Sequence, residues 1–485
     1  MSEPTGTGFA LRPVKFSRLP RRGVLLGLSG PRLVTAGLGL LVLVVALSVA
    51  GGAGVAWTSP LWAGAAALTW SRVAGRPAFE WAPVVAHWLV RRAAGQTRYR
   101  RRMRPRPAGT LALPGDAAAL RQYDDPVSGA VMIRDPHAAT LTAVLDVTHP
   151  AFVLLDPAEQ QRRVEGWGRV LAAACRSSRL ARVQVLERTL PDSGSGLAAW
   201  WRQRGVDDGS WVAGVYRDLL ATAGPAGERH VSLIALALDL RAASRAIRSA
   251  GGGMSGAAAV LRQEMDALTG ALRAAELRPS PWYTPDQLAL VLRTAYDPAV
   301  TAALEQHPDV GRNLATAGPI AVEESWDRLR SDSAWHAVLW VSQWPLAMVY
   351  PGFLAPILLT TGARRCVSIV YQPLRADVAA RDIRRKKVEH LSDRAQRARI
   401  GQVEDAAISA EYADVLQQEA DLAAGAGVLR YAAFVAVTAS TSDELDAAVA
   451  AIEQAAVQAS CETRRLYGQQ AAAFAAAALP LARGL

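Results

Sequence analysis

The sequence predicts an α+β cytoplasmic domain, built of β-α-β units in two layers, that follows a transmembrane hairpin of two helices. Two observations predict this class: an uncharged run of 39 residues flanked by basic residues, and an alternation of strand-like and helix-like segments further on. The chain has 485 residues, which is too long for one ordinary core. We expect five segments: a basic N-terminus (1–31), the hairpin (32–71), a juxtamembrane segment (72–109), a first α+β unit (110–280) and a second one (281–485).

The net charge of +11 is unevenly distributed along the chain. Residues 1–106 contain 16 basic and two acidic side chains, whereas the remainder contains 38 basic and 41 acidic ones. The soluble part is therefore mildly acidic, and the high isoelectric point reflects the segments that flank the uncharged run. Basicity alone therefore gives no reason to expect a nucleic-acid-binding domain.

The uncharged run lies between Arg32 and Arg72 and is long enough for two spanning helices. Gly51, Gly52, Gly54 and Pro60 interrupt it, so we expect helices at about 32–50 and 55–71. Because basic clusters occur on both sides, the positive-inside rule predicts two spans with both termini in the cytoplasm. The competing interpretation is a signal peptide cleaved after the sequence SVA at 48–50, but the basic leader is long for that.

The juxtamembrane segment predicts lipid contact. Residues 79–92 have an apolar helical face that includes Trp81 and Trp88, as in a helix lying in the membrane interface. An arginine run follows, which we expect to contact anionic headgroups. The residues concerned are Arg98, Arg100, Arg101, Arg102, Arg104 and Arg106. The same run could instead contact nucleic acid.

From about residue 110 onward, strands and helices alternate. TLTAVLDV (140–147), a helix capped by Asp156, and ARVQVLERT (181–189) form one predicted β-α-β unit. After a tryptophan-bearing helical stretch and a strand at 229–240, Gly251-Gly252-Gly253 predicts a flexible connector. The second half repeats this rhythm. Its predicted elements are strands at 335–345, 365–373 and 429–439, one long charged helix at about 375–422, and a helix with the capping box Thr441–Glu444.

No catalytic, cofactor-binding or metal-binding motif is present. None of the three lysines follows a glycine, which excludes a Walker A phosphate-binding loop. The seven histidines lack metal-site spacing, so we interpret each as a surface or a hydrogen-bonded core residue, and the three cysteines are scattered. Residues 253–257 miss the G-x-S-x-G nucleophile motif at its last position. We therefore predict no enzyme activity, no cofactor and no metal.

Parts of the sequence resemble a known family. The stretch LLGLSGPRL, the hairpin, and GRPAFEWAPVVAHWLVRRAAGQTRYRRR are similar to PrgI-family membrane proteins of actinobacterial conjugative elements. Those proteins join a two-helix anchor to a domain similar to the N-terminal, non-motor region of TrbE/CagE type IV secretion ATPases. YQPLRADVAARDIRRKK, LRYAAFVAVTA and the C-terminal YGQQAAAFAAAALPLARGL agree with that region. The family supplies no catalytic residues to carry over.

The resemblance implies a non-enzymatic scaffold or docking subunit of a conjugation or type IV secretion apparatus in the cell membrane. Its expected partners are membrane lipids, a separate secretion ATPase and other channel subunits, and a homo-oligomer stays open. One alternative is a membrane-tethered nucleic-acid-binding module that guides DNA to the channel during DNA transfer. The other is an enzyme whose site is invisible to motifs, which would require a cleft of clustered, perturbed titratable groups.

Overall fold

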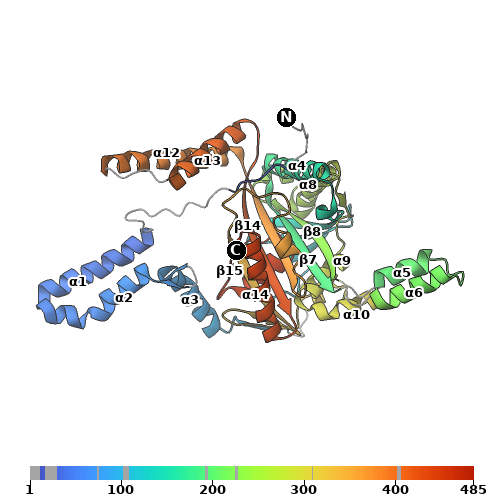
Figure 1. The fold of residues 1–485 in the computed structure, drawn as a ribbon, viewed down its shortest axis with the longest axis horizontal. Coiled ribbons are helices and arrows are strands. Elements are labelled where there is room, and N and C mark those ends of the chain that lie inside the picture. Colours follow the sequence, from blue (N-terminus) through green and yellow to red (C-terminus); the bar gives the residue numbers. More distant parts are fainter. Residues whose placement is uncertain are drawn as a thin grey trace, which may run out of the picture. The chain divides into compact units, whose positions relative to one another are not determined.

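The fold was determined as a computed structural model, which describes residues 11–16, 30–73, 76–101, 109–191, 195–223, 228–307, 310–400 and 406–484. It consists of two compact units, shown in Figure 1. The smaller unit comprises Arg18–Thr97, and the larger one combines Met1–Ser17 with Arg98–Leu485. Residues 11–16 therefore belong to the same unit as the domain that follows the uncharged segment, although the sequence predicted a separate basic N-terminus.

The smaller unit is helical. α1 (Gly30–Trp57) contains a break at Gly51, whose backbone has φ +55°, and α2 (Ser59–Trp70) follows directly. A short antiparallel pair, β1 (Arg72–Val73) with β2 (Arg76–Pro77), leads into α3 (Ala78–Ala93). Gly51 is one of the glycines at which the sequence predicted the chain to turn, and its left-handed conformation is one that glycine adopts without steric cost.

The larger unit is built around one 13-stranded sheet whose strand pairs are all antiparallel. Its order is β3-β10-β11-β12-β14-β13-β7-β8-β6-β5-β4, with β15 beside β12 and β9 beside β6. The first half of the domain has these elements: β4 (Arg121–Asp124), β5 (Val131–Asp135), β6 (Thr140–Thr148), α4 (Pro157–Arg176), β7 (Leu180–Pro191), α5 (Ser195–Arg204), α6 (Trp211–Ala223), β8 (Glu228–Asp239), α7 (Ser244–Ser249), α8 (Gly253–Ala274) and β9 (Arg278–Pro279). α9 (Pro285–Tyr296) and α10 (Thr301–Gln306) connect this half to the next.

The second half repeats the topology of the first. Its elements are β10 (Ala321–Glu324), β11 (Leu329–Ser331), β12 (Ala334–Gln343), α11 (Ala355–Leu358), β13 (Arg364–Leu374), α12 (Ala376–Ile400), α13 (Ala406–Ala423), β14 (Val428–Ala439), α14 (Ser442–Gln458), β15 (Glu462–Arg465) and α15 (Gln470–Ala478). β14 lies between β12 and β13 as β8 lies between β6 and β7. In each half, two helices are inserted between the last pair of long strands: α5–α6 in the first and α12–α13 in the second.

The two halves join through β7 and β13, which pair antiparallel from Cys366 opposite Arg188 to Tyr371 opposite Val183. The units predicted at 110–280 and 281–485 therefore share one sheet. β6 and β7, for which the sequence predicted a β-α-β unit, run parallel but are not adjacent, because β8 lies between them. Because β7 and β13 run in opposite directions, the inserted helix pairs leave the sheet at opposite ends, as Figure 1 shows.

Helices cover both faces of the sheet, where the sequence predicted two layers. On one face, α4 and α8 pack on β6 and β8 through residues such as Val170 and Leu261, and α14 packs on β12 and β14 through Leu445 and Ile452. On the other face, α9 and α15 form the largest core cluster. α15 is nearly all alanine, which lets a helix lie close to the strands beneath it. The helices on this second face make a third layer. Their position depends on tertiary packing, which a local sequence pattern does not predict.

The glycines at 251–253, which the sequence predicted to be a connector, all have positive φ and make the turn from α7 into α8. One local prediction needs correction. The charged helix predicted at 375–422 is two helices. Lys387 and Glu419 pair at 2.7 Å, whereas one continuous helix would separate them by about 48 Å. The two helices therefore fold back on each other.

Candidate membrane and docking surfaces

The apolar helices of the smaller unit pack against each other in antiparallel fashion. Thr35 Oγ1 lies 3.1 Å from Thr69 Oγ1, and a Cβ added at Gly39 would lie 2.7 Å from that of Ala65. The segment Arg32–Trp57 is long and apolar enough to cross a membrane. α2 has only 12 residues, but residues 52–57 extend it beyond the break, so that the second arm covers residues 52–70. That length, about 28 Å, approaches the thickness of a hydrocarbon core.

The two tryptophans expected to contact lipid both lie on α3. Trp81 and Trp88 are half-buried, while Leu89 and Val90 on the same helix are 52% and 67% exposed. The guanidinium of Arg92 lies over the Trp88 ring, 5.0 Å from its centroid. α3 thus leaves apolar and basic groups accessible together, which is the composition of an interfacial helix.

The arginine run is divided by the fold. Arg98–Arg100 form β3, an edge strand paired with β10, and Arg98 bonds Glu323 at 3.0 Å. The amide of Arg101 donates to the carbonyl of Ile320 at 2.8 Å. Arg102, Arg104 and Arg106 lie outside the described residues. The alternation Arg-Tyr-Arg, in which Tyr99 packs against the core, was a strand signal that the high charge of the run obscured.

Residues 11–16 contact the domain, which sequence reasoning missed. Val14 exchanges two backbone hydrogen bonds with Val349, at 2.7 and 3.0 Å. Lys15 pairs with Asp414 of α13 at 2.6 Å. Phe16 stacks on Trp344, 5.0 Å between ring centroids. Hydrogen bonds, an ion pair and an aromatic contact together hold this short segment on the second half of the domain.

One polar cluster lies on the sheet near the root of the α5–α6 pair. The Ser232 hydroxyl donates to Glu187 and lies 3.0 Å from Nε2 of His149. In a nucleophilic triad, the carboxylate orients the histidine. Here Glu187 contacts the serine instead, and Nδ1 of His149 faces the carbonyl of Pro150 at 3.1 Å. The cluster therefore lacks the order of groups that activates a serine.

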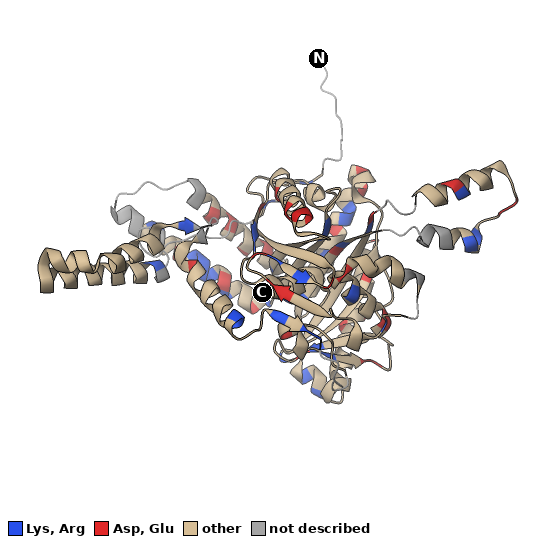
Figure 2. Ribbon diagram, turned by 90° about the horizontal axis from the view of Figure 1, so that it is seen from below, with Lys and Arg blue, Asp and Glu red and all other residues tan. Residues whose placement is uncertain are grey.

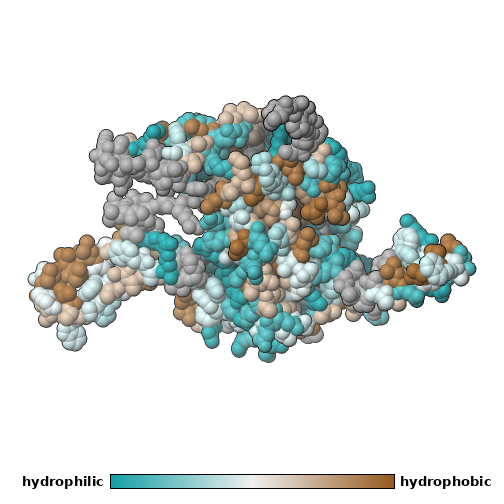
Figure 3. Space-filling model, in the orientation of Figure 1, coloured by the Kyte–Doolittle hydropathy of each residue, from teal (hydrophilic) through white to brown (hydrophobic). Residues whose placement is uncertain are grey.

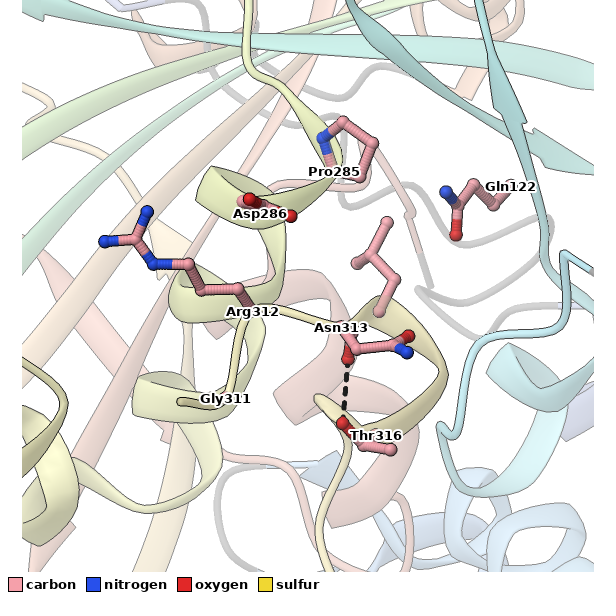
Figure 4. Close-up of a pocket in the computed structure, with 8 residues that line it drawn as sticks. Gln122, Pro285, Asp286, Gly311, Arg312, Asn313 and Thr316 are labelled. Atoms are coloured by element: carbon pink, nitrogen blue, oxygen red, sulfur yellow. Dashed lines mark hydrogen bonds between the residues drawn. The ribbon is translucent and has the colours of Figure 1, made fainter. Parts of the chain in front are cut away.

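A cavity of about 380 Å³ opens beside the start of α9 (Figure 4). Its lining is polar and shallow, and it contains no histidine, cysteine, serine or lysine. The lining residues are Gln122, Pro285, Asp286, Gly311, Arg312, Asn313, Leu314 and Thr316. Within the described ranges, no group of three or more His, Cys, Asp or Glu side chains could hold a metal ion.

His336 is a hydrogen-bonded core residue, as the sequence predicted for histidines in general. Its ring nitrogens lie 2.6 Å from Ser331 Oγ and 2.9 Å from Thr438 Oγ1, and its ring packs on Phe474. Burial disfavours the charged imidazolium and lowers the pKa of His336 to about 3.

We expect this histidine to make the folded protein less stable as the pH is lowered. The unfolded chain takes up a proton near pH 6.5 and the folded chain does not, so the contribution is complete above pH 6.5 and is lost as pH falls toward 3. At pH 5 the loss is about 2 kcal/mol. Urea unfolding of the full chain in detergent, followed by tryptophan fluorescence at pH 8 and pH 5, should show this loss. His336→Gln should show a pH dependence smaller by that amount, and equal slopes would contradict the assignment.

Part of the chain is similar to a known protein family. Residues 226–341 match the family model "Putative type VII ESX secretion system translocon, EccE". The matched range covers less than half of the chain and runs from β8 to β12, across the junction of the two halves. No curated protein matches the chain. Together, the apolar N-terminal helix and the similarity to a translocon family indicate a membrane-associated component of a secretion system.

Proposed function

We propose that this chain is a non-enzymatic structural and docking subunit of a secretion apparatus, anchored in the cell membrane by two spans with both termini in the cytoplasm. The α1–α2 hairpin is the anchor, and the repeated antiparallel domain is the docking platform. The partners are membrane lipids, a separate motor ATPase and other subunits of the apparatus.

The position of residues 11–16 carries this proposal. These residues precede the hairpin, yet Val14, Lys15 and Phe16 contact the domain that follows it. A single crossing would put residues 11–16 and the domain on opposite sides of the membrane, so their contact requires an even number of crossings. The two antiparallel arms, residues 30–50 and 52–70, supply two crossings. Basic side chains on both flanks favour the cytoplasm for both ends.

Two similarities suggest which secretion apparatus is involved. The match over residues 226–341 favours a translocon of the type VII class. The resemblance to PrgI-family and TrbE/CagE proteins rests mainly on residues 75–102 and on the C-terminal part from Tyr371, which lie outside that range. Conjugation or type IV secretion is therefore the second candidate, supported by different parts of the same chain.

Lipid contact is assigned to α3 and the start of the arginine run. The apolar groups of α3 and the exposed side chain of Arg98, 76% accessible, are the groups that an anionic leaflet would attract. The nucleic-acid alternative is weaker, because the basic groups of α3 lie beside exposed apolar ones, as in an interfacial helix, and acidic and basic side chains are interspersed over the domain (Figure 2).

The two-span topology predicts opposite labelling of two engineered cysteines. Ala53→Cys at the turn of the hairpin should react with a membrane-impermeant maleimide in intact cells. Val127→Cys, on a domain residue that is 72% exposed, should react only after the inner membrane is permeabilised. The unmodified chain, with Cys175, Cys366 and Cys461, supplies the background. Labelling of Val127→Cys in intact cells, or protection of Ala53→Cys in them, would overturn the topology.

A further inference from the structure

The α5–α6 pair leaves an apolar stripe of α6 largely exposed. Trp211, Val212, Val215 and Leu219 of α6 are 81%, 65%, 47% and 47% exposed. Figure 3 shows apolar surface on this pair of helices where it projects from the sheet. The packing between the two helices uses other side chains: Trp201 stacks on Tyr216 at 4.6 Å, and Ala213 is buried. The stripe is therefore available to a partner.

The charges beside the stripe favour a protein partner. The described residues 200–223 contain three arginines and three aspartates, and Arg217 lies 3.9 Å from Asp207. A neutral surface has no attraction for nucleic acid. Asp207 and Asp208, adjacent to the exposed Val206 at the tip, would be repelled by an anionic leaflet.

The spacing of the stripe suits pairing with an identical helix. Trp211, Val215 and Leu219 are each four residues apart, so they form an i±4 ridge that is centred on Val215. Two such ridges pack into each other's grooves at about −50°, the commonest arrangement of packed helices. In a two-fold pair centred on Val215, Trp211 of one copy meets Leu219 of the other. A Cβ added at the neighbouring Gly214 would meet nothing within 4 Å, so the backbone there is open to close approach.

The exposed area agrees with a modest dimer. The four side chains expose on the order of 400 Å² of mostly apolar surface, the size of patch that is often functional on a monomer. Two copies and their flanking residues would bury about 1,000 Å², near the lower limit for a specific interface. Anchoring in one membrane, which rests on the proposed function, raises the effective concentration of copies.

We propose that two copies of this chain associate through α6, with Trp211, Val215 and Leu219 of one helix packed on the same residues of the other across a two-fold axis at Val215. The inserted helix pair of the first half is thus a self-association element. The equivalent pair in the second half, α12–α13, is contacted by the chain's own N-terminal segment through Lys15 and Asp414.

A cysteine at the proposed axis tests this pairing. In the full-length protein in membranes, mild oxidation of Val215→Cys should give a disulfide-linked dimer. Val206→Cys, which is 74% exposed at the tip of the same helix pair, should give little. In detergent, light scattering should show a dimer for the unmodified chain and a monomer for the double variant Trp211→Ser/Leu219→Ser, with unchanged circular dichroism.

Three results would overturn the proposal. One is cross-linking of Val206→Cys as efficient as that of Val215→Cys. Another is a mass that the double variant leaves unchanged. The third is quenching of a fluorophore on Val215→Cys by brominated lipid in nanodiscs that hold one copy, which would place the stripe on the bilayer. None of these depends on the number of membrane spans, so failure of the dimer and failure of the topology are distinguishable.

Discussion

Gly318→Ala should destabilise the domain by at least about 3 kcal/mol, because no space exists for a methyl group at this position. A Cβ there would lie 1.7 Å from the carbonyl oxygen of Ala112 and 2.5 Å from its carbonyl carbon. Both are backbone atoms of a fully buried segment, Leu111–Leu113, so neither can rotate away. Urea unfolding of the purified full chain in detergent, followed by tryptophan fluorescence, measures the loss.

Gly270→Ala is the matched control. Gly270 lies within α8 and a Cβ there would meet nothing within 4 Å, so the change should stabilise the protein by about 0.5–1 kcal/mol through helix propensity. Equal midpoints for Gly318→Ala and the unmodified chain would disprove the close approach.

Elements with local signals could be predicted from sequence. The Asp156 cap is confirmed, since its carboxylate accepts from the amides of Ala158 and Glu159 at 3.0 Å. The Thr441–Glu444 capping box is confirmed in both directions. The strands predicted at 140–147 and 181–189 correspond to β6 and β7 within two residues at either end. Helix caps and strand patterns each depend on residues only a few positions apart, so they can be recognised in the sequence itself.

Strand order could not be predicted, because it depends on pairings between distant residues. β8 enters between β6 and β7 only after the α5–α6 insertion, and β13 joins β7 across more than 170 residues. The repeated rhythm of the two halves was visible, but the sheet that fuses them was not. The same contrast between local and long-range signals applies to the candidate docking surfaces. The apolar helices and Trp81 and Trp88 were visible as composition, whereas the docking of residues 11–16 depends on Val349, Asp414 and Trp344.

Gln184 shows a further limit, because a polar residue in the middle of a strand gives no local sign of its partners. It lies on β7, fully buried, and makes four hydrogen bonds. Its Nε2 donates to Ser368 Oγ at 2.9 Å and to the carbonyls of Ala476 and Leu479 at 3.0 and 3.1 Å. Its Oε1 accepts from the amide of Ala482 at 2.7 Å. One side chain thus holds the C-terminal segment on the strand beside the seam between the halves.

Gln184→Leu should therefore cost about 3 kcal/mol or more and release the C-terminal segment. Leucine has a similar volume but leaves the Ala482 amide and two buried carbonyls with fewer partners, and each buried group left unsatisfied costs about 1–3 kcal/mol.

Ser368→Ala, which removes one of these contacts, should cost less. Gln122→Leu is the control on the edge strand β4. It removes only a solvent-exposed hydrogen bond to Asp124, so it should change stability by less than about 0.5 kcal/mol. Urea unfolding ranks the variants, and carboxypeptidase digestion reports release, with residues beyond Leu479 removed from Gln184→Leu before the control. If the C-terminus of Gln184→Leu stays as resistant as that of Gln122→Leu, apolar packing of Leu479 and Leu481 holds the segment without Gln184.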